Sequence, residues 1–428
     1  MREDIKKRIE EVRRGEVPDG YRRTRAGLMP LEWKGNLAAK DVFRNHTNKK
    51  HNGEFEVLSA TQDRGIIPRS EVDIDIKYAE ENIGSYKKVE AGDFVISLRS
   101  FQGGIEYSEY EGLVSPAYTV LKATQPISDN FYRAYFKTPD FISRLNGAVY
   151  GIRDGKQIGF EDFGELAVHY PPLTEQQKIA EILAACDRMI ELKKQLVDEY
   201  KKTKKIFLRR LFPTQGENVP ELRFPGFKGE WRKCRLGALS DFITKGATPT
   251  TYGYQWETTG IPFFRNDSIQ DNRFVYGEYS FISETAHNAL SRSEVKGDDI
   301  LIAITGDIGK VGIVPKDVIR GNINQHMARV RIIRDALPFF VYQYLCTATM
   351  QSNYQLIKTG ISMPQLSLDQ IRNTEILLPS LEEQQCIAAC LKNLDEAIEL
   401  HLQELEEVQR QKKTMMQLLL TGLVRVNA

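Results

Sequence analysis

Side chains that can read nucleic-acid bases and phosphates recur in short, glycine-bearing loops along this chain. Arginine and lysine pair with guanine, asparagine and glutamine pair with adenine, and glycine lets the backbone approach a phosphate. One such loop alone is an ordinary turn, but these loops occupy corresponding places in the two halves of the sequence. The pattern therefore favours DNA binding by a set of candidate residues: Lys49, Lys50, Arg64, Arg99, Ser100, Gln102, Arg153, Lys156 and Gln157 in the first half, and Lys245, Thr248, Arg265, Asn266, Lys310, Asn322, Asn324, Gln325, Ser362 and Gln365 in the second.

The sequence lacks the motifs of the common catalytic and metal sites. Residues 305–310 (TGDIGK) resemble a phosphate-binding loop, but the spacing differs and Val311 replaces the required Ser or Thr. Residues 170–173 (YPPL) resemble the tetrapeptide of base methyltransferases without its leading Asp or Asn, so we interpret them as the start of a helix. The six histidines show no ligand spacing. Cys386 and Cys390, four apart on a predicted helix, are expected to be core residues rather than metal ligands. We expect no catalytic residue and no metal.

Two stretches that would position these loops are near-copies of each other. Residues 173–212 align without a gap onto residues 381–420, with 16 of 40 positions identical, where chance would give about two or three. Both carry apolar residues at heptad spacing, which predicts helices about 60 Å long. Thr174 and Ser380 are candidate N-caps. A repeat of this length indicates a duplicated domain.

The charges of the two helices predict how they pair. Residues 193–212 hold eight basic and two acidic side chains, whereas residues 380–399 hold five acidic and one basic. These opposite charges meet only if the helices run antiparallel. Surface ion pairs add little stability, but they select orientation.

The remaining segments predict mixed helix and sheet. Apolar runs at residues 93–98 and 299–304 occupy matching places in the two halves, and each follows a Gly-Asp turn. We expect an α+β fold: two similar globular domains separated by two long helices that form an antiparallel coiled coil, with an internal pseudo-twofold repeat. The expected divisions are an N-terminal helix at 1–14, a first domain at 15–170, a central spacer helix at 171–213, a second domain at 214–378 and a C-terminal spacer helix at 379–428.

The overall composition adds limits rather than a function. The 59 basic and 58 acidic residues nearly cancel, so the net charge of +1 indicates no partner by itself. The first 14 residues are charged and lack the apolar segment of a signal peptide. No apolar run approaches the roughly 18 residues of a membrane span. We expect a soluble, cytoplasmic protein that does not contact a membrane.

The duplicated helix starts carry the most specific pattern. They read PPLTEQQKIA at 171–180 and LPSLEEQQ at 378–385, and they occur together with VPELRFPGF at 219–227 and VSPAY at 114–118. Together these pieces resemble the specificity subunit of type I restriction–modification systems over nearly the whole chain. The resemblance implies two target recognition domains, each of which reads one half of a split double-stranded DNA sequence.

The same resemblance implies partners. Two modification (methyltransferase) subunits would dock on the long helices, which also act as a ruler between the half-sites, and restriction subunits (ATP-dependent translocase and nuclease) would join them. The candidate docking residues are Glu175, Gln176, Gln177, Glu383, Gln384 and Gln385. The chain would bind no cofactor, because methyl donor, ATP and magnesium are used by the partners.

Two other interpretations make different demands on the sequence. A self-contained restriction–methylation enzyme would need an N-P-P-Y-like motif or a nuclease carboxylate cluster, and the sequence has neither. A coiled-coil scaffold with two protein-binding domains fits the helices equally well. Salt-dependent binding to duplex DNA distinguishes the specificity subunit from the scaffold.

Overall fold

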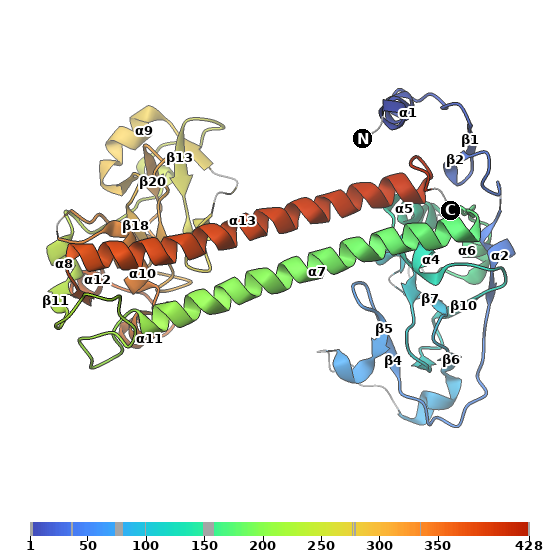
Figure 1. The fold of residues 1–428 in the computed structure, drawn as a ribbon, viewed down its shortest axis with the longest axis horizontal. Coiled ribbons are helices and arrows are strands. Elements are labelled where there is room, and N and C mark those ends of the chain that lie inside the picture. Colours follow the sequence, from blue (N-terminus) through green and yellow to red (C-terminus); the bar gives the residue numbers. More distant parts are fainter. Residues whose placement is uncertain are drawn as a thin grey trace. The chain divides into compact units, whose positions relative to one another are not determined.

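The computed structural model describes residues 3–35, 37–72, 80–98, 100–148, 158–275, 277, 280–333 and 335–426. The chain forms two compact units: unit 1 holds residues 1–193 and 404–428, and unit 2 holds residues 194–403. Two long helices, α7 (Leu173–Arg210) and α13 (Leu381–Leu420), contribute residues to both units (Figure 1).

Unit 1 is built on a four-stranded antiparallel sheet in the order β3-β10-β7-β8. The ribbons β1-β2, β4-β5 and β6-β9 are separate antiparallel pairs. The strands are β1 (Tyr21–Thr24), β2 (Gly27–Pro30), β3 (Phe43–Asn45), β4 (Leu58–Thr61), β5 (Gly65–Pro68), β6 (Lys87–Val89), β7 (Phe94–Ile96), β8 (Glu106–Tyr107), β9 (Gly112–Val114) and β10 (Thr119–Ala123). The shorter helices are α1 (Glu3–Arg13), α2 (Ala39–Val42), η1 (Arg69–Glu71), η2 (Glu80–Ser85), α3 (Ser100–Gly103), α4 (Asp129–Tyr135), α5 (Pro139–Gly147) and α6 (Phe160–Gly164).

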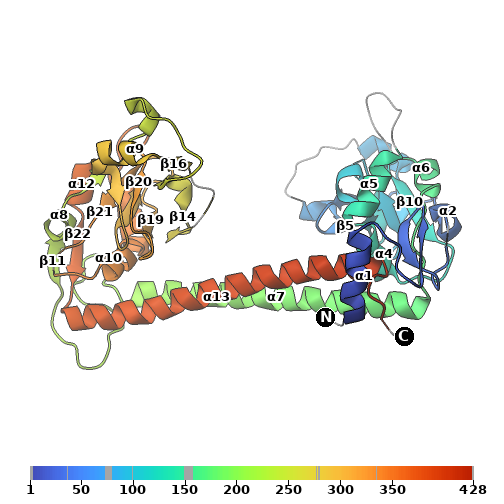
Figure 2. The same ribbon diagram turned by 90° about the horizontal axis from the view of Figure 1, so that it is seen from above.

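Aromatic side chains fill the core of unit 1 between the sheet and its helices. The fully buried ring of Phe43 lies 5.7 Å from that of Phe94 and 5.2 Å from that of Tyr132, measured between centroids. Both pairs meet edge to face, the geometry that the ring quadrupoles favour. At the surface, α1 lies by the end of α13 (Figure 2), where Arg8 donates to the carbonyl of Leu423 at 2.6 Å.

Unit 2 contains two four-stranded sheets, in the orders β12-β21-β18-β19 and β16-β13-β20-β17. The first is antiparallel, and the second pairs β13 with β20 in parallel. The strands are β11 (Arg232–Arg235), β12 (Thr244–Lys245), β13 (Ile261–Phe264), β14 (Ile269–Gln270), β15 (Arg273–Phe274), β16 (Ser280–Ile282), β17 (Glu294–Val295), β18 (Ile300–Ala303), β19 (Val311–Ile313), β20 (Gly321–Ile323), β21 (Met327–Val330) and β22 (Glu375–Leu378). The shorter helices are α8 (Leu236–Leu239), η3 (Pro249–Tyr252), η4 (Asn266–Ser268), α9 (Glu284–Ala289), η5 (Ser291–Ser293), α10 (Pro338–Leu345), α11 (Ala348–Ile357) and α12 (Leu368–Arg372).

Within each unit the two long helices run antiparallel, which confirms the expectation from their charges. In unit 2, Lys204 of α7 lies 2.6 Å from Asp395 of α13. In unit 1, Lys193 lies 2.5 Å from Glu404, and Asp187 pairs with Lys412. The partner numbers fall on α13 as they rise on α7, so the directions are opposite. One detail differs from expectation: α7 begins at Leu173, so Thr174 lies inside the first turn and does not cap it.

A buried carboxylate in the first turn of each long helix is held by an arginine from a distant part of the chain. Glu175 is 2% exposed and accepts from Arg425 Nε at 2.7 Å and from Trp33 Nε1 at 2.9 Å. Glu383 is 1% exposed and accepts from Arg223 Nε and a terminal guanidinium nitrogen, both at 2.8 Å. Bidentate pairing of this kind compensates a carboxylate for lost hydration.

The neighbouring glutamine also has the same role in both units. The Gln176 side-chain oxygen accepts from the backbone N–H of Ser128, and its amide donates to the carbonyl of Pro171, both at 2.9 Å. The Gln384 side-chain oxygen accepts from the N–H of Leu337 at 2.9 Å, and its amide donates to Pro379. Ser128 and Leu337 directly precede α4 and α10, so each glutamine joins a long helix to the start of a domain helix.

His169 is a buried titratable group in unit 1. It is 2% exposed, its Nδ1 lies 3.0 Å from the carbonyl oxygen of Leu420, and its ring lies 5.4 Å from that of Trp33. Because burial disfavours the charged imidazolium, the pKa of His169 falls from 6.5 to about 4.

We predict that unit 1 loses stability in mildly acidic solution. Because the pKa of His169 is lower in the folded chain, the unfolded chain binds the proton first as the pH falls. The contribution of neutral His169 to the free energy of unfolding is therefore fully present above pH 6.5. It falls by on the order of 3 kcal/mol as the pH drops toward about 4. Urea unfolding of Trp231→Phe/Trp256→Phe chains, with and without His169→Gln and followed by the fluorescence of the remaining Trp33, measures this. The variant should show a flatter pH dependence, and equal slopes would contradict the prediction.

We also predict that the Arg223–Glu383 pair is costly to break on one side only. Glu383→Met leaves a guanidinium that is 16% exposed without its carboxylate, and unit 2 should lose about 3–5 kcal/mol of stability. The double variant Arg223→Met/Glu383→Met removes both charges and should recover most of that loss. Calorimetry of the full chains measures both. A double variant no more stable than the single one would show that the pairing does not account for the loss.

Candidate nucleic-acid interface

Five of the candidate residues of unit 2 come together on loops at one edge of its sheets. We call Lys245, Thr248, Asn266, Gln325 and Gln365 the loop cluster. Lys245 ends β12, Asn266 begins the turn after β13, and Gln325 lies between β20 and β21. The Thr248 hydroxyl donates to the side-chain oxygen of Gln325. Gln365 forms an isolated β-bridge with Thr305, the residue whose carbonyl accepts from Asn266 Nδ2 at 2.8 Å.

A glycine allows this convergence. A Cβ built on Gly246 would lie 1.9 Å from the carbonyl oxygen of Ile323 and 2.3 Å from that of Asn324. Such distances are far inside van der Waals contact, so a larger residue would force the segment after β12 away from the β20–β21 turn. Gly246 therefore sets Thr248 against Gln325.

His326 organises the centre of the cluster, and the sequence did not single it out. Its Nδ1 lies 2.6 Å from the Thr305 hydroxyl, and its Nε2 lies 3.0 Å from the side-chain nitrogen of Gln325. When that amide donates to Nε2, the ring proton sits on Nδ1 and donates to the hydroxyl. A lone histidine in a polar loop carries no spacing signal, so only the fold identifies this role.

The cluster presents mixed donors and acceptors beside a hollow of about 410 Å³. Its lining includes Lys245, Gln325, Gln365 and Arg372. Asn266 Oδ1 is a buried acceptor with no hydrogen-bond partner in the described part of the chain, and within that part Lys245 forms no ion pair. Amides and a free ammonium are the groups that bind base edges and phosphates.

Other candidates of unit 2 are engaged within the protein. The Arg265 guanidinium lies 4.8 Å from the ring centre of Trp256 and donates to Ser280 at 2.9 Å, and Lys310 pairs with Asp307 at 2.7 Å. Asn322 is fully buried and bonds to His287 and Ser293. Asn324 is 9% exposed and accepts from the backbone N–H of His326 at 3.2 Å. The expectation that Asn322 reads bases is corrected, because its amide holds two core segments together. Ser362 is exposed.

Unit 1 carries a basic group in the loop before β4. Lys49 and Lys50 are both exposed. Lys88 donates its backbone N–H to the carbonyl of Asn48 at 2.8 Å, which brings this loop beside β6. Burial lowers the pKa of Lys87, and the positive charge of Lys49 lowers it further. The loop therefore places the exposed lysines Lys49 and Lys50 beside a strand that carries Lys87, and such a group of positive charges favours an anionic ligand.

A second group in unit 1 surrounds the β4–β5 turn. Arg64 is at this turn and pairs with Glu71, and Gln102 is exposed on α3. Lys137 joins the two segments, since its ammonium donates to the carbonyls of Gln62 at 3.2 Å and Gly103 at 2.8 Å. Lys137 thus positions this group, although no motif marks it.

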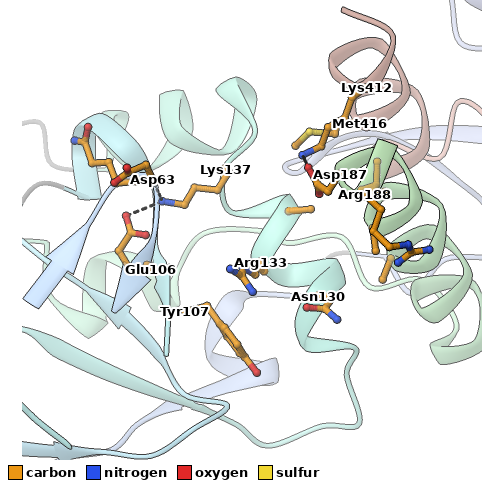
Figure 3. A pocket seen from close by; sticks show the side chains of 16 residues that line it. Asp63, Glu106, Tyr107, Asn130, Arg133, Lys137, Asp187, Arg188, Lys412 and Met416 are labelled. Carbon is orange, nitrogen blue, oxygen red and sulfur yellow. Dashed lines mark hydrogen bonds and ion pairs between the residues drawn. The ribbon is translucent and has the colours of Figure 1, made fainter. Parts of the chain in front are cut away.

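Lys137 also balances a buried acid. Figure 3 shows its side chain reaching toward Glu106, whose Oε1 lies 2.6 Å from the ammonium. Glu106 is 2% exposed, so burial raises its pKa, and the hydrogen bond from Lys137 offsets part of that shift. The two residues line a hollow of about 700 Å³, together with residues of α4, α7 and α13.

The remaining first-half candidates divide into two groups. Ser100 is buried, and its hydroxyl accepts from the backbone N–H of Ser97 at 2.9 Å, so the expectation that it contacts DNA is corrected. The other candidates, Arg99, Arg153, Lys156 and Gln157, lie outside the described residues.

The candidate docking residues are mostly internal. Glu175, Gln176, Glu383 and Gln384 are at most 2% exposed and bind partners within their own unit. These four are therefore corrected from docking residues to structural ones. Gln177 and Gln385 are exposed. In each motif the glutamate and the first glutamine face inward and the second glutamine faces solvent, because the first turn of the helix packs on the domain.

Two kinds of feature are absent from the part of the chain that the structure describes. No group of three or more histidine, cysteine, aspartate or glutamate side chains is placed there to hold a metal ion. No described helix is long and apolar enough to cross a membrane.

Comparison with known proteins agrees with the duplicated architecture. A putative type I restriction enzyme specificity subunit, MjaX of Methanocaldococcus jannaschii, is 26% identical over 433 residues, covering 95% of this chain and 97% of that protein. The EcoBI specificity subunit of Escherichia coli is 25% identical over 277 residues, 61% of this chain and 58% of that protein.

Solved structures share the fold. A chain from a type I restriction–modification system matches with a TM-score of 0.59 at 16% identity, covering 96% of this chain and all of that one. The S subunit of a type I system from M. genitalium matches with a TM-score of 0.53 at 14% identity, covering 92% and 97%. The family model described as "Type I restriction modification DNA specificity domain" matches twice, at residues 35–202 and 228–410. Since these two matches span most of the sequence, the chain belongs to the family of type I restriction modification DNA specificity domains.

Proposed function

We propose that this chain is the DNA sequence-specificity subunit of a type I restriction–modification complex, in which each unit reads one half of a split duplex target. The observation that carries this proposal is the double occurrence of the specificity domain, with a loop group of base- and phosphate-binding chemistry in each unit. Chemistry belongs to partner subunits, which use methyl donor, ATP and magnesium.

The loop cluster of unit 2 supplies the physical basis for sequence reading. Its amides are held by neighbours and are therefore preorganised, so little conformational entropy is lost on binding. Lys245 adds charge at the edge of the cluster. In unit 1 the corresponding groups are the exposed lysines Lys49 and Lys50 and the β4–β5 turn with Arg64. Phosphate contacts from such cations fix orientation, while amides discriminate bases.

The long helices offer equivalent surfaces for two copies of one partner. Leu192 and Leu400 occupy the same position of the repeated helix and are 66% and 54% exposed. Large apolar side chains this exposed at matching positions favour a protein partner in each unit. We infer that two modification subunits bind there, beside the exposed Gln177 and Gln385, and that restriction subunits join the assembled complex.

We predict that different residues of the loop cluster control the affinity for DNA and the sequence specificity. Lys245→Gln should weaken duplex binding for all sequences and reduce the slope of log affinity against log salt by about 1, because one phosphate contact is lost. Gln325→Ala should keep that slope and relax one half of the methylated sequence, since a bidentate base contact is worth about 1–3 kcal/mol.

Binding titrations at several salt concentrations and mapping of methylated adenines in cells measure the two effects. Lys316→Gln is the matched control, because this lysine side chain is 83% exposed and lies outside the cluster. A relaxed sequence in both halves after Gln325→Ala would contradict the assignment of one half to each unit. Salt-independent binding by the wild type would favour the protein scaffold instead.

We predict further that the two leucines act independently in partner binding. Leu192→Asp and Leu400→Asp should each lose one modification subunit, because a charge at the centre of an apolar contact is not solvated. The double variant should lose both. Native mass spectrometry of the reconstituted complex counts the subunits, with Leu356→Asp, at a residue 81% exposed on α11, as the control. Retention of two subunits by the double variant would place docking elsewhere.

A further inference from the structure

The loop between α11 and α12 carries two large apolar side chains in open solvent. Ile361 is 101% exposed and Met363 is 79% exposed. Transfer of such groups from water is among the larger favourable contributions to binding. Two of them at neighbouring positions of one loop tip therefore mark a contact surface.

Hydrogen bonds and a glycine turn hold the tip of this loop, residues 360–364, in one conformation. Thr359 N–H donates to the carbonyl of Gln365 at 2.9 Å, and Gln365 N–H donates back at 2.8 Å. Gly360 has a φ of +95°, and a Cβ there would lie 2.6 Å from the carbonyl oxygen of Met363. Only glycine adopts this turn without strain. Just beyond it, Leu366 is buried and its N–H donates to Ile304 at 2.9 Å.

The base of this loop is part of the loop cluster. Gln365 ends the tip and lines the same hollow as Lys245 and Gln325, and Lys358, which precedes the tip, is exposed. The two apolar side chains of the tip are thus flanked by amide and cationic side chains. This combination fits a duplex, whose phosphates and base edges surround apolar base faces, better than an apolar protein groove.

We propose that Ile361 and Met363 form a wedge that inserts between stacked base pairs of the half-site read by unit 2. The proposal rests on the proposed function and adds deformation of the DNA to base reading. Isoleucine and methionine are among the residues that proteins insert between base steps, where unstacking is offset by closer contact with the opened duplex. A flexible pyrimidine–purine step is the easiest to open, so the wedge would also contribute to sequence preference.

The test uses the full chain and a duplex that bears the sequence found methylated in cells carrying the complex. 2-Aminopurine is placed in turn at each step of the half-site that Gln325→Ala alters. We expect the wild type to raise its fluorescence at one step, because the probe brightens on unstacking. Ile361→Ser/Met363→Ser should lose that rise while it keeps the salt slope. Ile319→Ser, at an isoleucine 85% exposed on another loop, should behave as the wild type.

Affinity provides the second measurement. The double variant should bind the intact duplex on the order of tenfold or more weakly, because the burial of two apolar side chains is lost. A duplex with an abasic site at the opened step has already lost its stacking, so the wild type should bind it more tightly than the intact duplex, whereas the double variant should bind the two duplexes alike. Since both side chains are exposed, the substitutions should leave thermal unfolding unchanged.

Several outcomes would overturn the wedge. A fluorescence rise that persists in the double variant, or salt-dependent binding by the wild type with no rise at any step, removes the wedge and leaves the proposed function intact. Loss of a modification subunit from the variant complex, with the rise intact, would assign the tip to a protein partner. Absence of salt-dependent duplex binding by the wild type would remove both proposals.

Discussion

The buried carboxylate at the start of each long helix is the interaction on which both units depend. Glu175 and Glu383 are out of water, and a buried charge is tolerated only when paired and hydrogen-bonded. The pairing arginines come from far along the chain: Arg425 lies 250 residues from Glu175, and Arg223 lies 160 residues from Glu383. Each unit is therefore closed by a segment that follows the other long helix.

This closure explains why the helix starts are repeated so closely. The glutamate holds an arginine, the next residue (Gln176 or Gln384) joins the helix to α4 or α10, and only the third (Gln177 or Gln385) is exposed. The glutamate and the first glutamine are constrained by their sites, because each makes two or more hydrogen bonds where water is excluded. Their repetition thus reflects the assembly of each unit, while the exposed leucines of the helices are free for partners.

The reading loops show how a fixed scaffold supports variable contacts. In unit 2, Gly246 and His326 set the loop cluster, and in unit 1, Lys137 holds the β4–β5 turn and α3 against the buried Glu106. No sequence motif marks these positioning residues. Loops on a rigid sheet edge can change their amides and cations without disturbing the core, which suits a protein whose family recognises DNA sequences.

Local chemistry alone could not separate the members of the candidate site. Asn322 and Gln325 are three residues apart and both carry amides, yet Asn322 lies on β20 and is fully buried, whereas Gln325 is exposed in the turn that follows. In the same way, Ser100 is buried whereas Gln102, two residues later, is exposed. The residue type of Ile361 alone would favour a place in the core, whereas the fold exposes its side chain to solvent.

The sequence by itself determined the duplication, the two long helices, their antiparallel pairing and the family. Periodicity, charge and repeated motifs can be identified from the order of residues along the chain, without knowledge of the contacts in the fold. Only the tertiary structure decided which polar groups reach the surface. Glu175 and Glu383 resemble exposed docking residues, but arginines more than a hundred residues away bury them. Burial depends on which distant segments pack together in the fold, and the spacing of residues within one segment does not predict that packing.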